Sequence, residues 1–216
     1  MTGLELTHAR GADYGSRVHA EKIALLAGAP LGRVLDVGCA EGASAQVLRE
    51  HGATHIAGLE LDAAFAAKAR ERYDEVVTGS LPEDLAWPDA SFDTILAYDV
   101  LEHLPDPLAA LRTLRSLAAP NALLHVSVPN ARHFSLVRDL VFRGTFGYTE
   151  WGHRDSTHLR WLTRRDLVAL LEAAGWSVER TAHAELSPAG RFAERVTRGL
   201  SADFLVYQWS ALARAK

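Results

Sequence analysis

The stretch that decides the fold is Val34-Leu35-Asp36-Val37-Gly38-Cys39-Ala40-Glu41-Gly42. A buried strand, 33–37, runs into a glycine turn, and a helical pattern begins at Ala43. Glycines suit such a turn because the backbone must bend tightly and a ligand must approach without meeting a Cβ atom. Amides at the start of the following helix can bind a carboxylate or a phosphate. The stretch predicts an α/β fold with a ligand site after its first strand.

Strand and helix patterns alternate along the rest of the chain. The expected strands are 33–37, 55–61, 75–78, 92–98, 123–128, 176–181 and 204–212, and the expected helices are 13–26, 43–50, 63–73, 107–117, 133–142, 164–174 and 192–200. This alternation predicts a parallel sheet covered by helices. We expect a single domain over 1–216, with an N-terminal helical segment at 13–30. Residues 131–163 break the rhythm, and an insertion after a strand end is expected to cover a substrate site.

Composition narrows the class of protein. The 216 residues include 23 basic and 27 acidic residues, a net charge of −4, which gives no overall attraction for nucleic acid. Cys39 is the single cysteine, so no intramolecular disulfide forms, as in a reducing cytoplasm. No stretch approaches the roughly 18 apolar residues of a membrane span. We expect a cytoplasmic protein that binds neither nucleic acid nor membrane; the oligomeric state is left open.

Two carboxylates indicate the kind of ligand. Asp36 precedes the glycine turn, and Glu60 lies at the end of the second strand. A carboxylate beside the turn would repel a pyrophosphate but would attract an ammonium group, and Glu60 is placed to accept hydrogen bonds from ribose hydroxyls. The ligand therefore carries a ribose and a positive charge, which fits S-adenosylmethionine (SAM) better than a dinucleotide.

The ordered motifs resemble those of class I SAM-dependent methyltransferases. The first motif of that family is acidic-x-G-x-G-x-G, and here Ala40 replaces its middle glycine. The resemblance extends over roughly 32–178, through Gly58-Leu59-Glu60, Gly79-Ser80-Leu81, Phe92-Asp93-Thr94-Ile95, Leu101-Glu102-His103-Leu104-Pro105-Asp106-Pro107 and Val128-Pro129-Asn130. It implies a Rossmann-like seven-stranded sheet of order 3-2-1-4-5-7-6, with strand 7 antiparallel and helices on both faces.

The same resemblance implies which residues contact SAM. The methionine part would meet the first strand and its turn, the ribose and adenine the ends of strands two and three, and the sulfonium the end of strand four. In chain order these residues are Asp36, Gly38, Cys39, Gly42, Glu60, Leu61, Ser80, Leu81, Tyr98 and Asp99. The family often has an acidic residue where this chain has Ser80.

The acceptor side centres on a histidine after strand four. Methyl transfer is an in-line displacement, and a base is needed only if the acceptor must lose a proton. We expect His103 to be that base, with Glu102 orienting its ring; alternatively, the Glu-His-Leu-Pro run merely caps the next helix. Asp99, Glu102 and His103, with His153 or His158, could also hold a divalent cation, as in the similar ubiquinone-type O-methyltransferases. A metal is not favoured, because spacing does not fix the remaining ligands.

The run Trp151-Gly152-His153-Arg154-Asp155-Ser156-Thr157-His158-Leu159-Arg160-Trp161-Leu162-Thr163 is the second distinctive feature. It resembles a run found in bacterial methyltransferases of glycan and secondary-metabolite pathways, and in methionine-biosynthesis W-type proteins. Aromatic walls and arginine contacts suit a small polar acceptor. We expect that acceptor to contact Tyr148, Trp151, His153, Arg154 and His158. The alternative is structural, with Thr163 capping a helix and His158 tying the insertion to the sheet.

These observations predict a SAM-dependent methyltransferase that modifies an oxygen or nitrogen of a small polar acceptor such as a sugar or a natural-product intermediate. The W-type resemblance allows an alternative, a SAM-binding partner protein with little catalysis of its own. A nicotinamide-dependent oxidoreductase is disfavoured by Asp36 in front of the turn.

Overall fold

The computed structural model describes residues 16, 18–26, 28, 30–85, 87–183, 192, 195–197 and 201–216. The elements in chain order are α1 (Ala20–Ala24), β1 (Gly32–Val37), α2 (Ala45–Glu50), β2 (Ala53–Glu60), α3 (Ala63–Ala69), β3 (Glu75–Thr78), β4 (Phe92–Tyr98), η1 (Leu101–His103), α4 (Pro107–Leu117), β5 (Ala118–Pro129), α5 (Phe134–Phe142), α6 (Arg164–Ala173), β6 (Trp176–His183), α8 (Ala202–Leu205) and β7 (Gln208–Ala215). Among these described residues, no helix is both long enough and apolar enough to cross a membrane.

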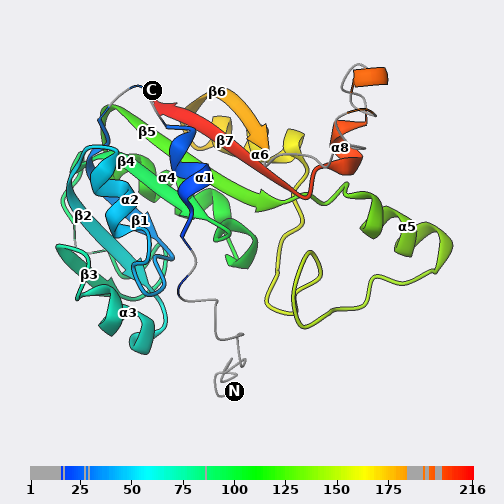
Figure 1. The fold of residues 1–216 in the computed structure, drawn as a ribbon, viewed down its shortest axis with the longest axis horizontal. Helices are drawn as coiled ribbons and strands as arrows, with labels where there is room; N and C mark the ends of the chain where they lie inside the picture. Colours follow the sequence, from blue (N-terminus) through cyan, green and yellow to red (C-terminus); the bar gives the residue numbers. More distant parts are fainter. Residues whose placement is uncertain are drawn as a thin grey trace.

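The strands form one seven-stranded sheet in the order β3-β2-β1-β4-β5-β7-β6, which confirms the predicted order (Figure 1). Strands β3, β2, β1, β4 and β5 pair in parallel, and β7 is antiparallel to both β5 and β6. The central strands are almost continuously apolar because helices cover both faces of the sheet. The Rossmann-like prediction from the sequence is therefore confirmed.

Two hydrophobic layers hold the helices to the sheet. Alternate residues of β1 point to opposite faces, so Val34 packs in one layer and Leu35 in the other. The layer around Val34 includes Ile23 of α1 and Leu48 of α2. The layer around Leu35 includes residues of α4 and α6, such as Leu111. Both faces of β1 are therefore buried, and this packing positions its carboxyl end.

Side-chain caps begin three of the helices where the sequence changes pattern. Asp62 accepts from two backbone amides at the start of α3, and Asp106 accepts from one at the start of α4. Thr163 and Asp166 form a reciprocal capping box at the start of α6. The helix-capping role expected of Thr163 is therefore confirmed.

The boundaries of the terminal elements differ from the prediction. Helix α1 covers only Ala20–Ala24 of the expected 13–26; residues 13–15 and 17 lie outside the described residues, and Val18 and His19 are not helical. β-Branched Val18 disfavours a helix, and the first buried contact comes only at Ile23. The expected strand 204–212 begins instead at Gln208, after helix α8, because pairing with β5 sets its register. The expected helix 192–200 lies mostly outside the described residues.

The insertion 131–163 begins just past the carboxyl end of β5. Figure 1 shows α5 and the loop after it beyond that end, on the side away from β3. The loop has little regular pairing of its own: single bridges join Thr149 to Asp155 and Asn130 to Leu162. The same edge of the sheet carries the ends of β1, β2 and β4, and the switch in strand order between β1 and β4 leaves a crevice there.

Candidate active site

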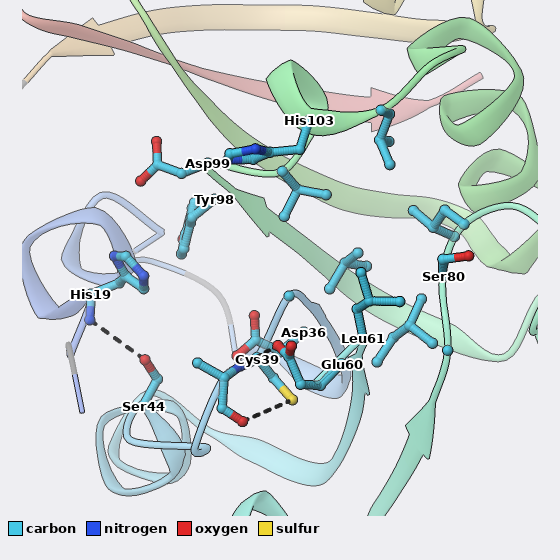
Figure 2. A pocket seen from close by; sticks show the side chains of 18 of the residues that line it. His19, Asp36, Cys39, Ser44, Glu60, Leu61, Ser80, Tyr98, Asp99 and His103 are labelled. Carbon is cyan, nitrogen blue, oxygen red and sulfur yellow. Dashed lines mark hydrogen bonds between the residues drawn. The ribbon is translucent and has the colours of Figure 1, made fainter. Parts of the chain in front are cut away.

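A cavity of about 540 Å³ lies at the carboxyl ends of β1, β2 and β4, a volume suited to a nucleoside-sized ligand. Its lining includes most of the residues expected at the cofactor and the base, namely Asp36, Gly38, Cys39, Glu60, Leu61, Ser80, Leu81, Tyr98, Asp99 and His103. Figure 2 shows Asp36 and Glu60 beside Cys39, with Tyr98, Asp99 and His103 across the cavity. Gly42 and Glu102 lie outside the lining, as do Tyr148, Trp151, His153, Arg154 and His158.

The glycine turn has the tight bend that the sequence predicted. Gly38 has φ +70°, and a Cβ atom there would lie 2.8 Å from Cγ2 of Val100. Its amide donates to the Leu59 carbonyl over 2.8 Å, which fastens the turn to β2. Gly42 also has φ +70°, but it packs against α3, where a Cβ atom would lie 3.2 Å from Cα of Ala69. Gly42 therefore supports the turn from behind, whereas Gly38 forms the wall of the cavity.

Asp36 is buried at the floor of the cavity and has a perturbed pKa. Burial raises the pKa of its carboxyl from 3.8 to about 7, and the nearby charge of Glu60 adds to this, while the hydrogen bond from Tyr73 opposes it. The Tyr73 hydroxyl donates to Oδ2 of Asp36 over 2.6 Å. A buried carboxylate of this kind is stabilised by a cation. The floor of the cavity therefore favours a positively charged ligand group.

Glu60 is held by backbone amides on both sides. Its Oε2 accepts from the Ala40 amide, and its Oε1 accepts from the Asp62 amide, each over 2.9 Å. A carboxylate oxygen has more than one lone pair, so both oxygens retain capacity for a further donor. The arrangement fixes Glu60 in one orientation, with its carboxylate in the same cavity as Asp36.

The third-strand end completes the cavity opposite the turn. Leu81 is buried, whereas Leu61 is 73% exposed at the rim. Two apolar side chains of this kind can enclose a flat aromatic ring. The Ser80 amide donates to Asp84, and its hydroxyl donates to Glu83 over 3.5 Å. Glu83 also lines the cavity, a contribution that the sequence analysis missed.

Helix α1 contributes charge to the end of β4. Asp99, at φ +57°, lies 3.2 Å from Nζ of Lys22, and Gln208 donates to its other oxygen. The same Lys22 ammonium lies 4.9 Å from the centre of the Tyr98 ring. His19 also lines the cavity, and its ring centre is 5.0 Å from that of Tyr98. Apart from the expected helix before β1, no sequence pattern indicates these contacts.

The ring of His103 is held by hydrogen bonds with the insertion. Its Nδ1 lies 3.2 Å from the Thr157 carbonyl and 3.0 Å from the Thr157 hydroxyl. A carbonyl oxygen can only accept, so this contact favours the tautomer with the proton on Nδ1 and a lone pair on Nε2. Within the described part of the chain, neither carboxyl oxygen of Glu102 has a hydrogen-bond partner. Among the described residues Thr157, and not Glu102, forms a hydrogen bond with the His103 ring, and an orienting role for Glu102 stays a prediction.

Glu102 is nevertheless placed in a cluster of metal-ligand type. It is 1% exposed, and burial, followed by the charge of Asp99, raises the pKa of its carboxyl well above the usual value. One ligand atom each from Glu102, His103 and His158 lie within 4.8 Å of one another. Nδ1 of His158 lies 3.1 Å from the His153 carbonyl, which leaves Nε2 as the acceptor. Two such imidazoles beside an unpartnered carboxyl group fit a divalent cation.

The remaining residues expected at the acceptor lie in the insertion away from the cavity. Tyr148 and Trp151 are exposed to solvent. His153 is buried with Nε2 2.9 Å from the Tyr207 carbonyl, and burial lowers its pKa to about 4, so the ring is neutral. Arg154 pairs with Asp139 at 3.2 Å. Arg154 therefore pairs within the insertion, whereas His153 ties the insertion to the segment before β7. Acceptor contact by these four residues stays a prediction.

Comparison with known proteins indicates the family of proteins that share this sequence pattern. The sequence model of a family described as "Methyltransferase domain" matches residues 11–181. A Mycolicibacterium smegmatis protein named "probable S-adenosylmethionine-dependent methyltransferase" is 35% identical over 150 residues, 68% of this chain and 53% of its own. The ubiquinone biosynthesis O-methyltransferase of Paracidovorax citrulli is 32% identical over 137 residues, 55% of this chain and 56% of its own. The chain thus spans about half the length of these curated relatives.

Solved structures show the same fold at low identity. A SAM-dependent methyltransferase from Mesorhizobium loti has a TM-score of 0.64 and 19% identity, with 90% of this chain and 97% of that chain covered. One from Aquifex aeolicus has a TM-score of 0.61 and 17% identity, with 95% and 94% covered. At these identities the likeness concerns the fold alone.

Proposed function

Since the chain belongs to the methyltransferase domain family, we propose that its cavity binds SAM and that it transfers the methyl group to an oxygen or nitrogen of a small polar acceptor. The observation that carries the proposal is the buried pair Asp36 and Glu60, which shares one cavity with the Gly38 turn. A cationic nucleoside complements this pair, whereas a pyrophosphate would be repelled.

Each part of SAM has a matching region of the cavity. The ammonium group would lie near Asp36, and the ribose hydroxyls would donate to the remaining lone pairs of Glu60. The adenine ring would lie between Leu61 and Leu81, beside Ser80. The sulfonium would then face Tyr98 and Asp99, and its methyl group would point to the side of the cavity that His103 lines.

The chemistry proposed is a direct displacement at the methyl carbon. The acceptor atom attacks that carbon as the carbon–sulfur bond breaks, and S-adenosylhomocysteine leaves as a neutral thioether. Where the acceptor is a hydroxyl, its proton passes to Nε2 of His103, which the Thr157 contact leaves unprotonated. The name of the Paracidovorax citrulli relative supports an oxygen acceptor. The methyl group, the proton and the charge are then all accounted for.

Calorimetric titration tests the binding step. SAM and S-adenosylhomocysteine should each bind with a stoichiometry of one ligand per chain, and NAD should not bind. Glu60→Gln should weaken both nucleosides, because an amide nitrogen cannot accept from ribose or from the Ala40 amide. Absence of SAM binding to folded protein would refute the proposal. SAM binding without methyl transfer to any hydroxyl or amine acceptor, together with a co-purifying enzyme, would support the alternative of a partner protein.

A divalent cation is a second candidate at the end of η1, because Glu102 is buried without a partner in the described part of the chain. His103 and His158 would complete the ligand set. When bound, a cation would act as a Lewis acid that lowers the pKa of an acceptor hydroxyl. Mn²⁺ titration followed by electron paramagnetic resonance should show one site that Glu102→Gln removes; unchanged activity after exhaustive chelation, with no Mn²⁺ signal, would exclude it.

A further inference from the structure

An exposed apolar surface covers α5 and the loop that follows it. Every residue from 140 to 151 is exposed. Large apolar or aromatic side chains in and next to this run are 40% to 82% exposed: Phe134, Leu140, Val141, Phe142, Phe146, Tyr148 and Trp151. We call these seven residues the docking surface. All seven lie within residues 134–151, and a gathering of exposed large apolar side chains is typical of an interaction site.

The fold uses only a small part of the apolar content of α5. Leu136 and Asp139 are the buried residues of this helix. Phe134 and Val141 are seven positions apart and share a face of the helix. Phe142 directly follows Val141 in the sequence. These three side chains are 49%, 63% and 82% exposed, so the fold leaves much of their apolar surface open to solvent. A helix of this kind suits a surface on which one apolar side is embedded.

Positive charge is concentrated beside the docking surface. Asp139 forms ion pairs with three arginines: Arg138 at 2.9 Å, Arg143 at 3.3 Å and Arg154 at 3.2 Å. The four side chains together carry a net charge of +2. The insertion 131–163 has five arginines and three carboxylates, a net charge of +2, whereas the whole chain carries −4. The arginine stems can lie along apolar groups while the guanidinium groups reach anionic ones.

We propose that the docking surface binds the surface of an anionic lipid bilayer. Exposed aromatic residues such as Trp151 and Tyr148 favour the boundary between headgroups and acyl chains, and the guanidinium groups complement anionic headgroups. A symmetric contact with a second copy is less suitable, because it would bring the two arginine clusters together. This proposal departs from the expectation that the protein binds no membrane, which rested on the lack of a membrane-spanning stretch; peripheral docking needs no such stretch.

Docking would bring the cavity near the bilayer. The loop continues from the docking surface to Thr157 and His158, and both contact the ring of His103 at the cavity wall. An acceptor with a polar head and an apolar tail could then present its head to that wall from the lipid. Vesicle binding itself does not depend on SAM, so it is measured without SAM and is independent of the proposed function.

Vesicle co-sedimentation tests the proposal. The full chain should sediment with vesicles of phosphatidylcholine and phosphatidylglycerol, and much less with phosphatidylcholine alone. The double variant F142S/W151S should bind the anionic vesicles about tenfold more weakly or less. Val18→Ser is the matched control, since Val18 is also exposed, at 45%, but lies before α1. It should bind like the wild-type chain. Unchanged SAM affinity shows that each variant is folded.

Three outcomes would overturn the proposal. One is wild-type protein that stays in the supernatant with both vesicle types. Another is equal loss of vesicle binding in F142S/W151S and Val18→Ser. The third is light scattering that shows a dimer dissociated by F142S/W151S in the absence of lipid binding, which would assign the surface to a second copy. Raised salt should weaken vesicle binding, because the headgroup attraction is electrostatic.

Discussion

Tyr73 donates a hydrogen bond to Asp36 over 2.6 Å, so the floor of the cavity is a carboxyl group held by a phenol from the segment after α3. The bond lowers the pKa of Asp36, but burial outweighs it and leaves that pKa at about 7. Near neutral pH, Asp36 therefore changes charge easily. This property leads to two predictions, one for binding and one for stability.

SAM affinity should depend on the charge of Asp36. Below pH 7 the ligand-free protein holds a proton on this carboxyl, and that proton must leave before the carboxylate can pair with the ammonium group of SAM. The dissociation constant should therefore rise by up to about tenfold per pH unit as the pH falls from 7 to 5.5. Calorimetry across this range measures it. Asp36→Asn should bind SAM weakly with a flat pH profile; an equally flat wild-type profile would contradict the assignment.

Folding stability should show the reverse dependence. The pKa of Asp36 is raised from 3.8 to about 7, so the native state binds this proton more tightly than the unfolded chain. Stability from this group is fully present below pH 3.8 and is lost as the pH rises through 7, by about 4 kcal/mol at most. Asp36→Asn should abolish this loss of folding stability at high pH, because asparagine does not titrate. Without SAM, the variant should gain unfolding free energy relative to wild type at pH 8 and less at pH 5.5, as measured by urea denaturation.

Substitutions at Gly38 can separate the cost of a left-handed φ from the cost of steric contact with Val100. Gly38→Ala should destabilise the chain by about 1–3 kcal/mol, because it places a Cβ atom on a residue with left-handed φ and 2.8 Å from Cγ2 of Val100. Val100→Ala should remove the contact and recover part of the loss. Gly144→Ala is the matched control, since Gly144 has φ +62° but nothing within 4 Å of its added Cβ. A Gly144 variant as unstable as the Gly38 variant would show that contact with Val100 plays no part.

His103 should be needed for turnover but not for SAM binding. His103→Ala should lower kcat by about 10²–10⁴-fold with a hydroxyl acceptor and leave the SAM dissociation constant within about twofold. The control is His55→Ala, since His55 lies outside the cavity beside Glu75. Rapid-quench kinetics separates the methyl-transfer step from product release. Wild-type turnover in the His103 variant would remove this residue from the chemistry.

The strand order followed from the resemblance of the ordered motifs to the class I methyltransferases, whereas the shared site of Asp36 and Glu60 followed from their places near strand ends. Asp36 and Glu60 end parallel strands, and parallel pairing brings such ends to one edge of the sheet. The acceptor side depends on contacts between distant segments. Thr157 meets His103 only after the insertion folds back, and His19 reaches the cavity from its position just before α1. Glu102 follows Leu101 in a 3-10 helix and does not line the cavity. No local pattern encodes these three placements.

Cys39 gives a practical consequence of the tight packing under the glycine turn. Its side chain is 7% exposed, and a Cβ atom on Gly58 would lie 2.7 Å from its sulfur, so the thiol fills a space that glycine leaves open. Burial also raises the pKa of the thiol, and the thiol form is a poor nucleophile. Alkylating reagents should modify this single thiol only when the turn opens. The rate of Cys39 labelling therefore measures how often the glycine turn opens. A ligand bound in the cavity should lower that rate.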